Sequence, residues 1–141
     1  MLSGVRELMV HAADDQLRTR EQQAPSTIAA FLKTLIGFRC DECIVVFFLD
    51  ARHGVIDHEI VSFGRVDYAT MDARRILLRA MARGAVGIII AHNHPSGDPR
   101  PSTSDMRVTR ELADTCRGLG IHLRDHLVIA GGQVRSAMFE N

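Results

Sequence analysis

The sequence lacks net charge and has almost no lysine. Among its 141 residues, 17 Lys and Arg balance 17 Asp and Glu, and Lys33 is the single lysine. Zero net charge argues against a protein that coats nucleic acid by bulk electrostatic attraction, although a local basic patch stays compatible with it. The length fits one domain, and a hydrophobic fraction of 46% argues against wholesale disorder.

Features that would direct the chain to a membrane or out of the cell are also missing. The first twenty residues contain six charged side chains, so they form no apolar signal core. The longest apolar runs, Cys43–Leu49 and Ala85–Ala91, fall far short of the roughly 18 residues that span a bilayer. Three cysteines, an odd number, do not make a disulfide framework. We therefore expect a protein of the reducing cytoplasm that does not associate with membranes.

Apolar side chains at intervals of three and four residues predict three helices. Each predicted helix has a Ser or Thr that can cap its start and a glycine that can end it. We expect helices over residues 26–37, 70–84 and 102–118 (or to 120), capped by Ser26, Thr70 and Ser102, with Met81 and Met106 on their apolar sides.

Two unbroken apolar runs predict central strands that are buried on both faces. Other segments alternate around turns and predict hairpins. The order of elements predicts an α/β fold of the α+β type, with a mixed β-sheet and flanking helices. The expected strands are Cys43–Leu49, Val55–Phe63, Ala85–Ala91, His122–Ala130 and Val134–Met138.

Residues 91–105 hold the pattern that indicates chemistry. His92 and His94 lie two apart on extended backbone, so both imidazoles point to one side and can reach one ion. Three of the four prolines stiffen the loop that follows, and this loop can hold Asp105 opposite the histidines. Two imidazoles and one carboxylate leave a tetrahedral Zn²⁺ a fourth position for water, which is typical of catalytic sites.

The same residues resemble a known signature. The pattern His92-x-His94-Pro95 followed by Ser102-x-x-Asp105 resembles H-x-H-P-x(6)-S-x-x-D of the JAMM (JAB/MPN) zinc metalloproteases. Within that group, the string His-Asn-His-Pro-Ser-Gly-Asp-Pro-x-Pro-Ser is similar to the bacterial RadC family. The resemblance extends to Glu42 before the first apolar strand and to Asp125-His126 at the closing strand, and it covers residues 26–140.

The resemblance implies a zinc-dependent hydrolase that cleaves a peptide or isopeptide bond of a protein or peptide substrate. His92, His94 and Asp105 would bind Zn²⁺. Glu42 would act as general acid and base, and Ser102 would donate a hydrogen bond to the developing oxyanion. The implied fold is of the JAB/MPN type, with an architecture related to that of the cytidine deaminases.

The resemblance also frames the organisation of the chain and a second function. RadC proteins usually carry an N-terminal helix-hairpin-helix module, which we expect to be missing here. We divide the chain into an N-terminal extension or helix, 1–25, and a JAMM/RadC-like domain, 26–141. The second function is a DNA-repair-associated accessory domain that binds nucleic acid or a repair partner with little or no proteolysis. A homodimer stays open.

Each candidate residue has a simpler interpretation. The two histidines could be solvated loop residues, and Asp105 could be a first-turn acid that favours the helix dipole, with Ser102 as N-cap. Glu42 could be a solvated acid at a strand entrance, because its strand start must meet the end of the histidine strand to reach the metal. Ser96 competes with Ser102 as the hydroxyl donor.

Other patterns have weaker support. Cys40-x-x-Cys43 precedes a strand rather than a helix, so a thioredoxin-type redox pair is not expected. His126 is interpreted as a buried polar residue, with a role beside the metal ligands as the alternative. The stripe of Arg75, Arg79 and Arg83 fits a solvated helix face better than a phosphate site. A zinc deaminase is excluded because H-x-E and P-C-x-x-C are missing, and a His-Asn-His nuclease is not favoured.

Overall fold

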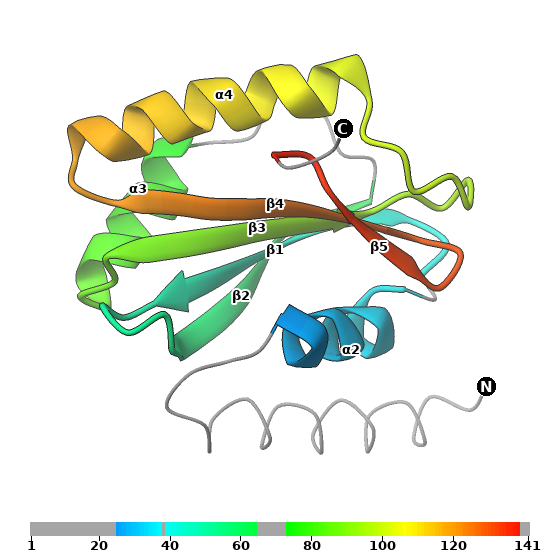
Figure 1. Cartoon of the computed structure of the whole chain (residues 1–141), viewed down its shortest axis with the longest axis horizontal. Coiled ribbons are helices and arrows are strands. Elements are labelled where there is room, and N and C mark those ends of the chain that lie inside the picture. Colours follow the sequence, from blue (N-terminus) through cyan, green and yellow to red (C-terminus); the bar gives the residue numbers. More distant parts are fainter. Residues whose placement is uncertain (1–24, 38, 65–72, 139–141) are drawn as a thin grey trace.

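A five-stranded sheet forms the centre of the computed structural model, which describes residues 25–37, 39–64 and 73–138 (Figure 1). Its strands are β1 (Glu42–Leu49), β2 (Val55–Gly64), β3 (Gly87–Asn93), β4 (His122–Ala130) and β5 (Gln133–Ser136). They lie in the order β2-β1-β3-β4-β5. β1 pairs antiparallel with β2 and β3, β3 pairs parallel with β4, and β5 pairs antiparallel with β4. The mixed sheet predicted from the sequence is therefore confirmed.

Helices cover both faces of this sheet. Helix α2 (Pro25–Leu35) packs on one face, and α3 (Ala73–Ala82) and α4 (Thr103–Gly118) pack on the other (Figure 1). The flanking helices expected from the sequence are thus present within the described residues. None of these helices combines the length and the apolar character needed to cross a bilayer.

Strand β1 shows why an unbroken apolar run was needed. Its even-numbered residues, such as Val46 and Phe48, pack with α3 and α4, whereas Val45 and Phe47 pack with α2. Successive strand side chains point to opposite faces, so a strand covered on both sides must be apolar at every position. Every β1 residue from Cys43 to Leu49 is buried.

Strand β3 carries this alternation into the motif. Ile88 and Ile90 belong to the core beneath α3 and α4, so the alternation directs His92 toward the same face. The chain leaves β3, crosses over that face as α4 and returns as the parallel strand β4. The first turn of α4 therefore lies at the carboxyl end of β3.

The structure differs from the sequence predictions at some points. Strand β3 runs to Asn93 rather than Ala91, because His92 and Asn93 still pair with β4. Met81 and Met106 are exposed, since α3 buries Ile76, Leu77 and Ala80 instead, and α4 turns another stripe inward. Thr70, the predicted cap, and residues 1–24 of the predicted extension 1–25 lie outside the described residues, whereas Pro25 is the first residue of α2. The buried residues of α4 are Asp105, Val108, Thr109, Leu112 and Cys116.

The two-sided burial of the central strands predicts unequal costs for the same truncation. Ile90→Ala should lower the free energy of unfolding by about 2–5 kcal/mol, because it removes a fully packed side chain from β3. Ile56→Ala in the edge strand β2, where the side chain is 40% exposed, is the matched control and should cost less than about 1 kcal/mol. Urea denaturation of both variants measures the difference, and equal costs would contradict the burial described here.

Candidate metal centre

Three side chains converge where β3 meets the first turn of α4. The Nε2 atoms of His92 and His94 lie 2.9 Å apart. Asp105 Oδ1 lies 3.3 Å from His92 Nε2, and Asp105 Oδ2 lies 3.2 Å from His94 Nε2. His92 and Asp105 are each only 2% exposed. Within the described residues, this is the one group of His, Cys, Asp and Glu side chains close enough to hold a metal ion together.

The backbone explains how the histidines reach this position. His92 is part of β3, and the N–H of His94 donates to the Ile129 carbonyl of β4 at 2.8 Å, which continues the pairing one step past the strand. Extended backbone at both positions turns the two imidazoles to the same side. The two imidazoles therefore lie on one side of the strand, as their two-residue spacing predicts.

Asp105 is held by the helix start. Its Oδ2 accepts from the Ser102 N–H at 2.7 Å, and the Ser102 hydroxyl accepts from the Asp105 N–H at 3.0 Å. This capping box satisfies two N–H groups that a helix start otherwise leaves without partners. The simpler interpretation of Asp105 as a capping acid is therefore correct, and it coexists with the approach to both histidines.

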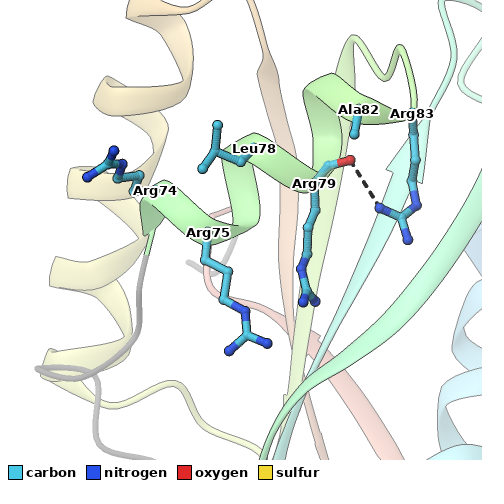
Figure 2. A pocket seen from close by; sticks show the side chains of 6 residues that line it. All are labelled: Arg74, Arg75, Leu78, Arg79, Ala82 and Arg83. Atoms are coloured by element: carbon cyan, nitrogen blue, oxygen red, sulfur yellow. Dashed lines mark hydrogen bonds between the residues drawn. The ribbon is translucent and has the colours of Figure 1, made fainter.

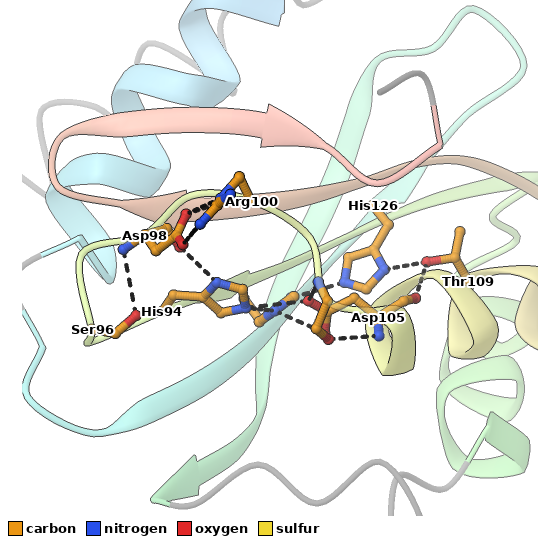
Figure 3. A network of polar contacts seen from close by, with 9 residues as sticks. His94, Ser96, Asp98, Arg100, Asp105, Thr109 and His126 are labelled. Atoms are coloured by element: carbon orange, nitrogen blue, oxygen red, sulfur yellow. Dashed lines mark hydrogen bonds and ion pairs between the residues drawn. The ribbon is translucent and has the colours of Figure 1, made fainter. Parts of the chain in front are cut away.

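Further polar contacts hold each imidazole from behind (Figure 3). His94 Nδ1 lies 2.9 Å from the Asp98 carbonyl oxygen. His92 Nδ1 lies 2.8 Å from His126 Nε2, whose ring also contacts Thr109 through Nδ1 at 2.6 Å. The buried His126 of the sequence analysis thus lies directly against a candidate ligand.

The pKa values of His94 and His126 are shifted in opposite directions. Hydrogen bonding to the Asp105 carboxylate raises the pKa of His94 above 6.5, the Asp98 carbonyl and the charge of Glu42 add to this, and partial burial opposes it. Burial lowers the pKa of His126 to about 3, and the neighbouring His92 contributes in the same direction. His126 is therefore neutral at physiological pH.

The three donors fit a tetrahedral Zn²⁺. Zinc bonds of about 2.0–2.2 Å to nitrogen and oxygen place neighbouring ligand atoms roughly 3.3 Å apart in a tetrahedron. The separations of 2.9, 3.3 and 3.2 Å lie close to that value before any adjustment of rotamers. Two imidazoles and a carboxylate also match the ligand types that zinc takes in hydrolases.

Glu42 lies at the same end of the sheet. Because β1 and β3 are antiparallel, with Ile44 opposite His92, the start of β1 adjoins the end of β3. The charge of Glu42 acts on the pKa of His94, which places the two groups within electrostatic reach. The condition that the sequence analysis set for Glu42, that these two strand ends meet, is therefore met.

Asn93 is a site residue that the sequence analysis did not single out. Its Oδ1 accepts from the Cys43 N–H at 2.7 Å, and its Nδ2 donates to the Asp41 carbonyl at 2.8 Å. These bonds hold the backbone on both sides of Glu42. A useful signal was the polar residue in a strand buried on both faces, since a buried amide requires partners.

The cysteines do not join the site. Cys40, Cys43 and Cys116 are in no disulfide, so the C-x-x-C motif forms no disulfide pair. Burial raises the pKa of the Cys116 thiol to about 11, which keeps it protonated and unreactive.

The competing hydroxyl of Ser96 accepts from the Asp98 N–H at 3.4 Å within the exposed loop.

The arginine stripe of α3 lies outside the metal centre and is partly neutralised. Arg79 pairs with Glu59, and Arg83 pairs with Glu59 and Asp57 of β2. Arg83 also lies 4.4 Å over the ring of Phe48. Nucleic-acid binding by this stripe stays a prediction, and these ion pairs count against it. Figure 2 shows the surface pocket beside it, which is lined by Arg74, Arg75, Leu78, Arg79, Ala82 and Arg83.

Comparison with known proteins gives one consistent result. A family model described as RadC-like JAB domain matches residues 22–141. A UPF0758 protein of Acidithiobacillus ferrooxidans (strain ATCC 53993 / BNL-5-31) is 36% identical over 123 residues, 87% of this chain and 55% of that relative. A UPF0758 protein of Burkholderia mallei (strain SAVP1) is 38% identical over 137 residues, 96% of this chain and 49% of that relative. The chain spans about half the length of these curated relatives.

The contact between His94 and Asp105 predicts a pH dependence in metal-free protein. Because the folded pKa of His94 is raised, its contribution to the free energy of unfolding is full below pH 6.5 and is lost as the pH rises through that raised pKa. Asp105→Asn keeps a capping side chain but removes the charge, so the pKa of His94 should fall. NMR titration of the imidazoles after chelation tests this, and an unchanged His94 pKa in the variant would contradict it.

Proposed function

The chain belongs to the RadC-like JAB domain family, and from this premise we propose that it is a zinc-dependent hydrolase of the JAMM type. In this proposal His92, His94 and Asp105 bind Zn²⁺, and the reaction is cleavage of a peptide or isopeptide bond. The observation that carries it is the convergence of two imidazoles and one carboxylate, with the acid Glu42 at the same end of the sheet. One acid outside the ligand set is what hydrolysis requires as a general base.

A bound Zn²⁺ would act as a Lewis acid and lower the pKa of a water molecule toward about 7. The Glu42 carboxylate would accept a proton from the attacking water and donate it to the nitrogen of the leaving amine. Its location at the start of β1, held on both sides by Asn93, supports this assignment, because proton transfer needs a carboxylate kept in place next to the reacting atoms.

Ser102 would stabilise the oxyanion. Its hydroxyl oxygen accepts from the Asp105 N–H, so the hydroxyl proton can be donated to the substrate. The residue caps the start of α4, where the partial positive charge of the helix dipole also favours developing negative charge. Ser102 and Asp105 would thus serve the reaction from the same turn of backbone.

The substrate class is part of the proposal. The names of the relatives state no activity, and the described chain spans only part of them. We assign a protein or peptide substrate because a zinc-activated water with a proton-shuttling carboxylate is suited to the carbonyl of an amide bond. Binding of nucleic acid is the weaker candidate, since two arginines of its proposed stripe are paired with acids.

Metal binding can be measured without knowing the substrate. After zinc loading and removal of excess metal, the protein should retain about one Zn²⁺ per chain by elemental analysis. His94→Ala should lose it, because two donors remain where three converge. His122→Ala, which removes an exposed histidine at the opposite end of the sheet, is the matched control. Wild-type protein that retains no stoichiometric zinc would refute the proposed function.

Catalysis by Glu42 predicts a separation of binding from turnover. Glu42→Gln should keep zinc but lose at least about 100-fold in rate, because an amide cannot accept the proton. The assay incubates zinc-loaded protein with a mixture of denatured cellular proteins and counts new amino termini by mass spectrometry. Glu111→Gln, an exposed position of α4 paired with Arg107, is the control and should cleave like wild type. An unchanged cleavage pattern for Glu42→Gln would remove Glu42 from the mechanism.

A further inference from the structure

We propose that His126 and Thr109 are positioning residues for the metal centre, and that they hold His92 in the tautomer that presents its Nε2 lone pair to the ion. This inference rests on the proposed function, since it assigns His92 as a ligand. It is carried by one chain of buried hydrogen bonds: His92 to His126, His126 to Thr109, and Thr109 to the backbone of Asp105.

The Asp105 carbonyl determines which group donates and which accepts in each of these hydrogen bonds. A carbonyl oxygen can only accept, so the hydroxyl of Thr109, 2.6 Å away, must donate its single hydrogen there. The 2.6 Å contact between Thr109 and His126 Nδ1 then needs a hydrogen from the imidazole. His126 therefore carries its proton on Nδ1.

The tautomer of His126 determines that of His92 in the same way. A neutral imidazole protonated on Nδ1 has a lone pair on Nε2, so His126 Nε2 accepts from His92 Nδ1 at 2.8 Å. The ring of His126 is 2% exposed and lies against another imidazole, an environment in which a second proton is costly. His92 is left with its proton on Nδ1 and its lone pair on Nε2, the atom that faces Asp105.

The chain also connects three elements. His92 belongs to β3, His126 to β4, and Thr109 to α4, one helical turn after Asp105. Because the last bond ends on the Asp105 backbone, the chain ties the carboxylate ligand to the imidazole ligand. The tautomer of His94 is fixed by a separate contact. The Asp98 carbonyl oxygen can only accept, so His94 Nδ1 must carry the proton that it donates there. With zinc bound, both Nε2 lone pairs would be directed at one point, whereas in metal-free protein the Nε2 of His94 can donate a proton to Asp105.

All four residues in this series of hydrogen bonds are buried, so each bond contributes more than it would at the surface. Their exposed fractions are 2% for His92, Asp105 and His126 and 4% for Thr109. In such surroundings an unsatisfied polar group is costly, so the hydrogen bonds leave little freedom for another tautomer. Partners of this kind typically change metal affinity 10- to 100-fold when they are removed.

Removal of one hydroxyl tests the inference. Thr109→Val keeps the shape of the side chain and should weaken zinc binding about 10- to 100-fold in a competition titration with a chromogenic chelator. Thr109→Ser should restore wild-type affinity. Thr115→Val is the matched control, because Thr115 makes the same hydrogen bond to a carbonyl four residues earlier on α4, at an exposed position.

A spectroscopic measurement separates positioning from general stability. Long-range ¹H–¹⁵N NMR correlations of the metal-free wild-type protein at pH 7.5 should show His126 and His92 as Nδ1–H tautomers. In Thr109→Val the His126 ring should populate the Nε2–H tautomer, even where the variant folds less stably. A wild-type His126 protonated on Nε2, or a folded Thr109→Val that binds zinc as tightly as wild type, would overturn the inference.

The two hypotheses fail in different ways. If wild-type protein binds no zinc, the proposed function is refuted, and the tautomers of His126 and His92 still decide whether the chain of bonds orients His92 as described. If zinc binds and either the tautomer of His126 or the Thr109→Val affinity differs from expectation, the metal centre stands and the positioning role is refuted.

Discussion

The fold and the candidate site both depend on the contacts that the Asp105 carboxylate makes with the helix start and with the two histidines. The carboxylate is buried, it accepts the N–H of Ser102, and it faces the Nε2 atoms of His92 and His94. A buried carboxylate is costly unless several donors or charges compensate it. Here the helix start supplies an N–H and a favourable dipole, and the histidines supply the rest. The start of α4 is consequently tied to the end of β3.

That tie depends in turn on the sheet topology. β3 lies between an antiparallel neighbour, β1, and a parallel neighbour, β4. The antiparallel pairing brings the start of β1, with Glu42, to the carboxyl end of β3. The parallel pairing requires a crossover, and the crossover helix α4 begins at that same end with Ser102 and Asp105. Glu42, Ser102 and the cluster of His92, His94 and Asp105 therefore lie at one end of the sheet, because the central strand β3 has neighbours of both kinds.

Most of the fold could be predicted from patterns that are local. The apolar runs predicted β1 and β3, the helical periodicity predicted α2, and Ser102 followed by an acid three residues later predicted the start of α4. The exposed faces of α3 and α4 could not be predicted as well. Met106 shares a helical stripe with Thr109 in the sequence, yet α4 is rotated so that Asp105 faces the sheet and Met106 faces solvent. The buried stripe of α4 combines Asp105 and Thr109 with the apolar side chains of Val108, Leu112 and Cys116.

The sequence by itself determined the donor types, the two-residue spacing that turns His92 and His94 to one side, and the capping box that holds Asp105. The sequence did not reveal which distant residues lie around these three side chains, because tertiary contacts bring them there. Strand pairing brings the start of β1, with Glu42, to the same end of the sheet as His92. Asn93 holds the backbone around Glu42, and His126 and Thr109 contact His92 and the Asp105 backbone. Backbone periodicity acts over a few residues and is written in the local sequence. Tertiary contacts, such as the hydrogen bond from Asn93 to the Asp41 carbonyl 52 positions earlier, exist only once the sheet order and its register have formed.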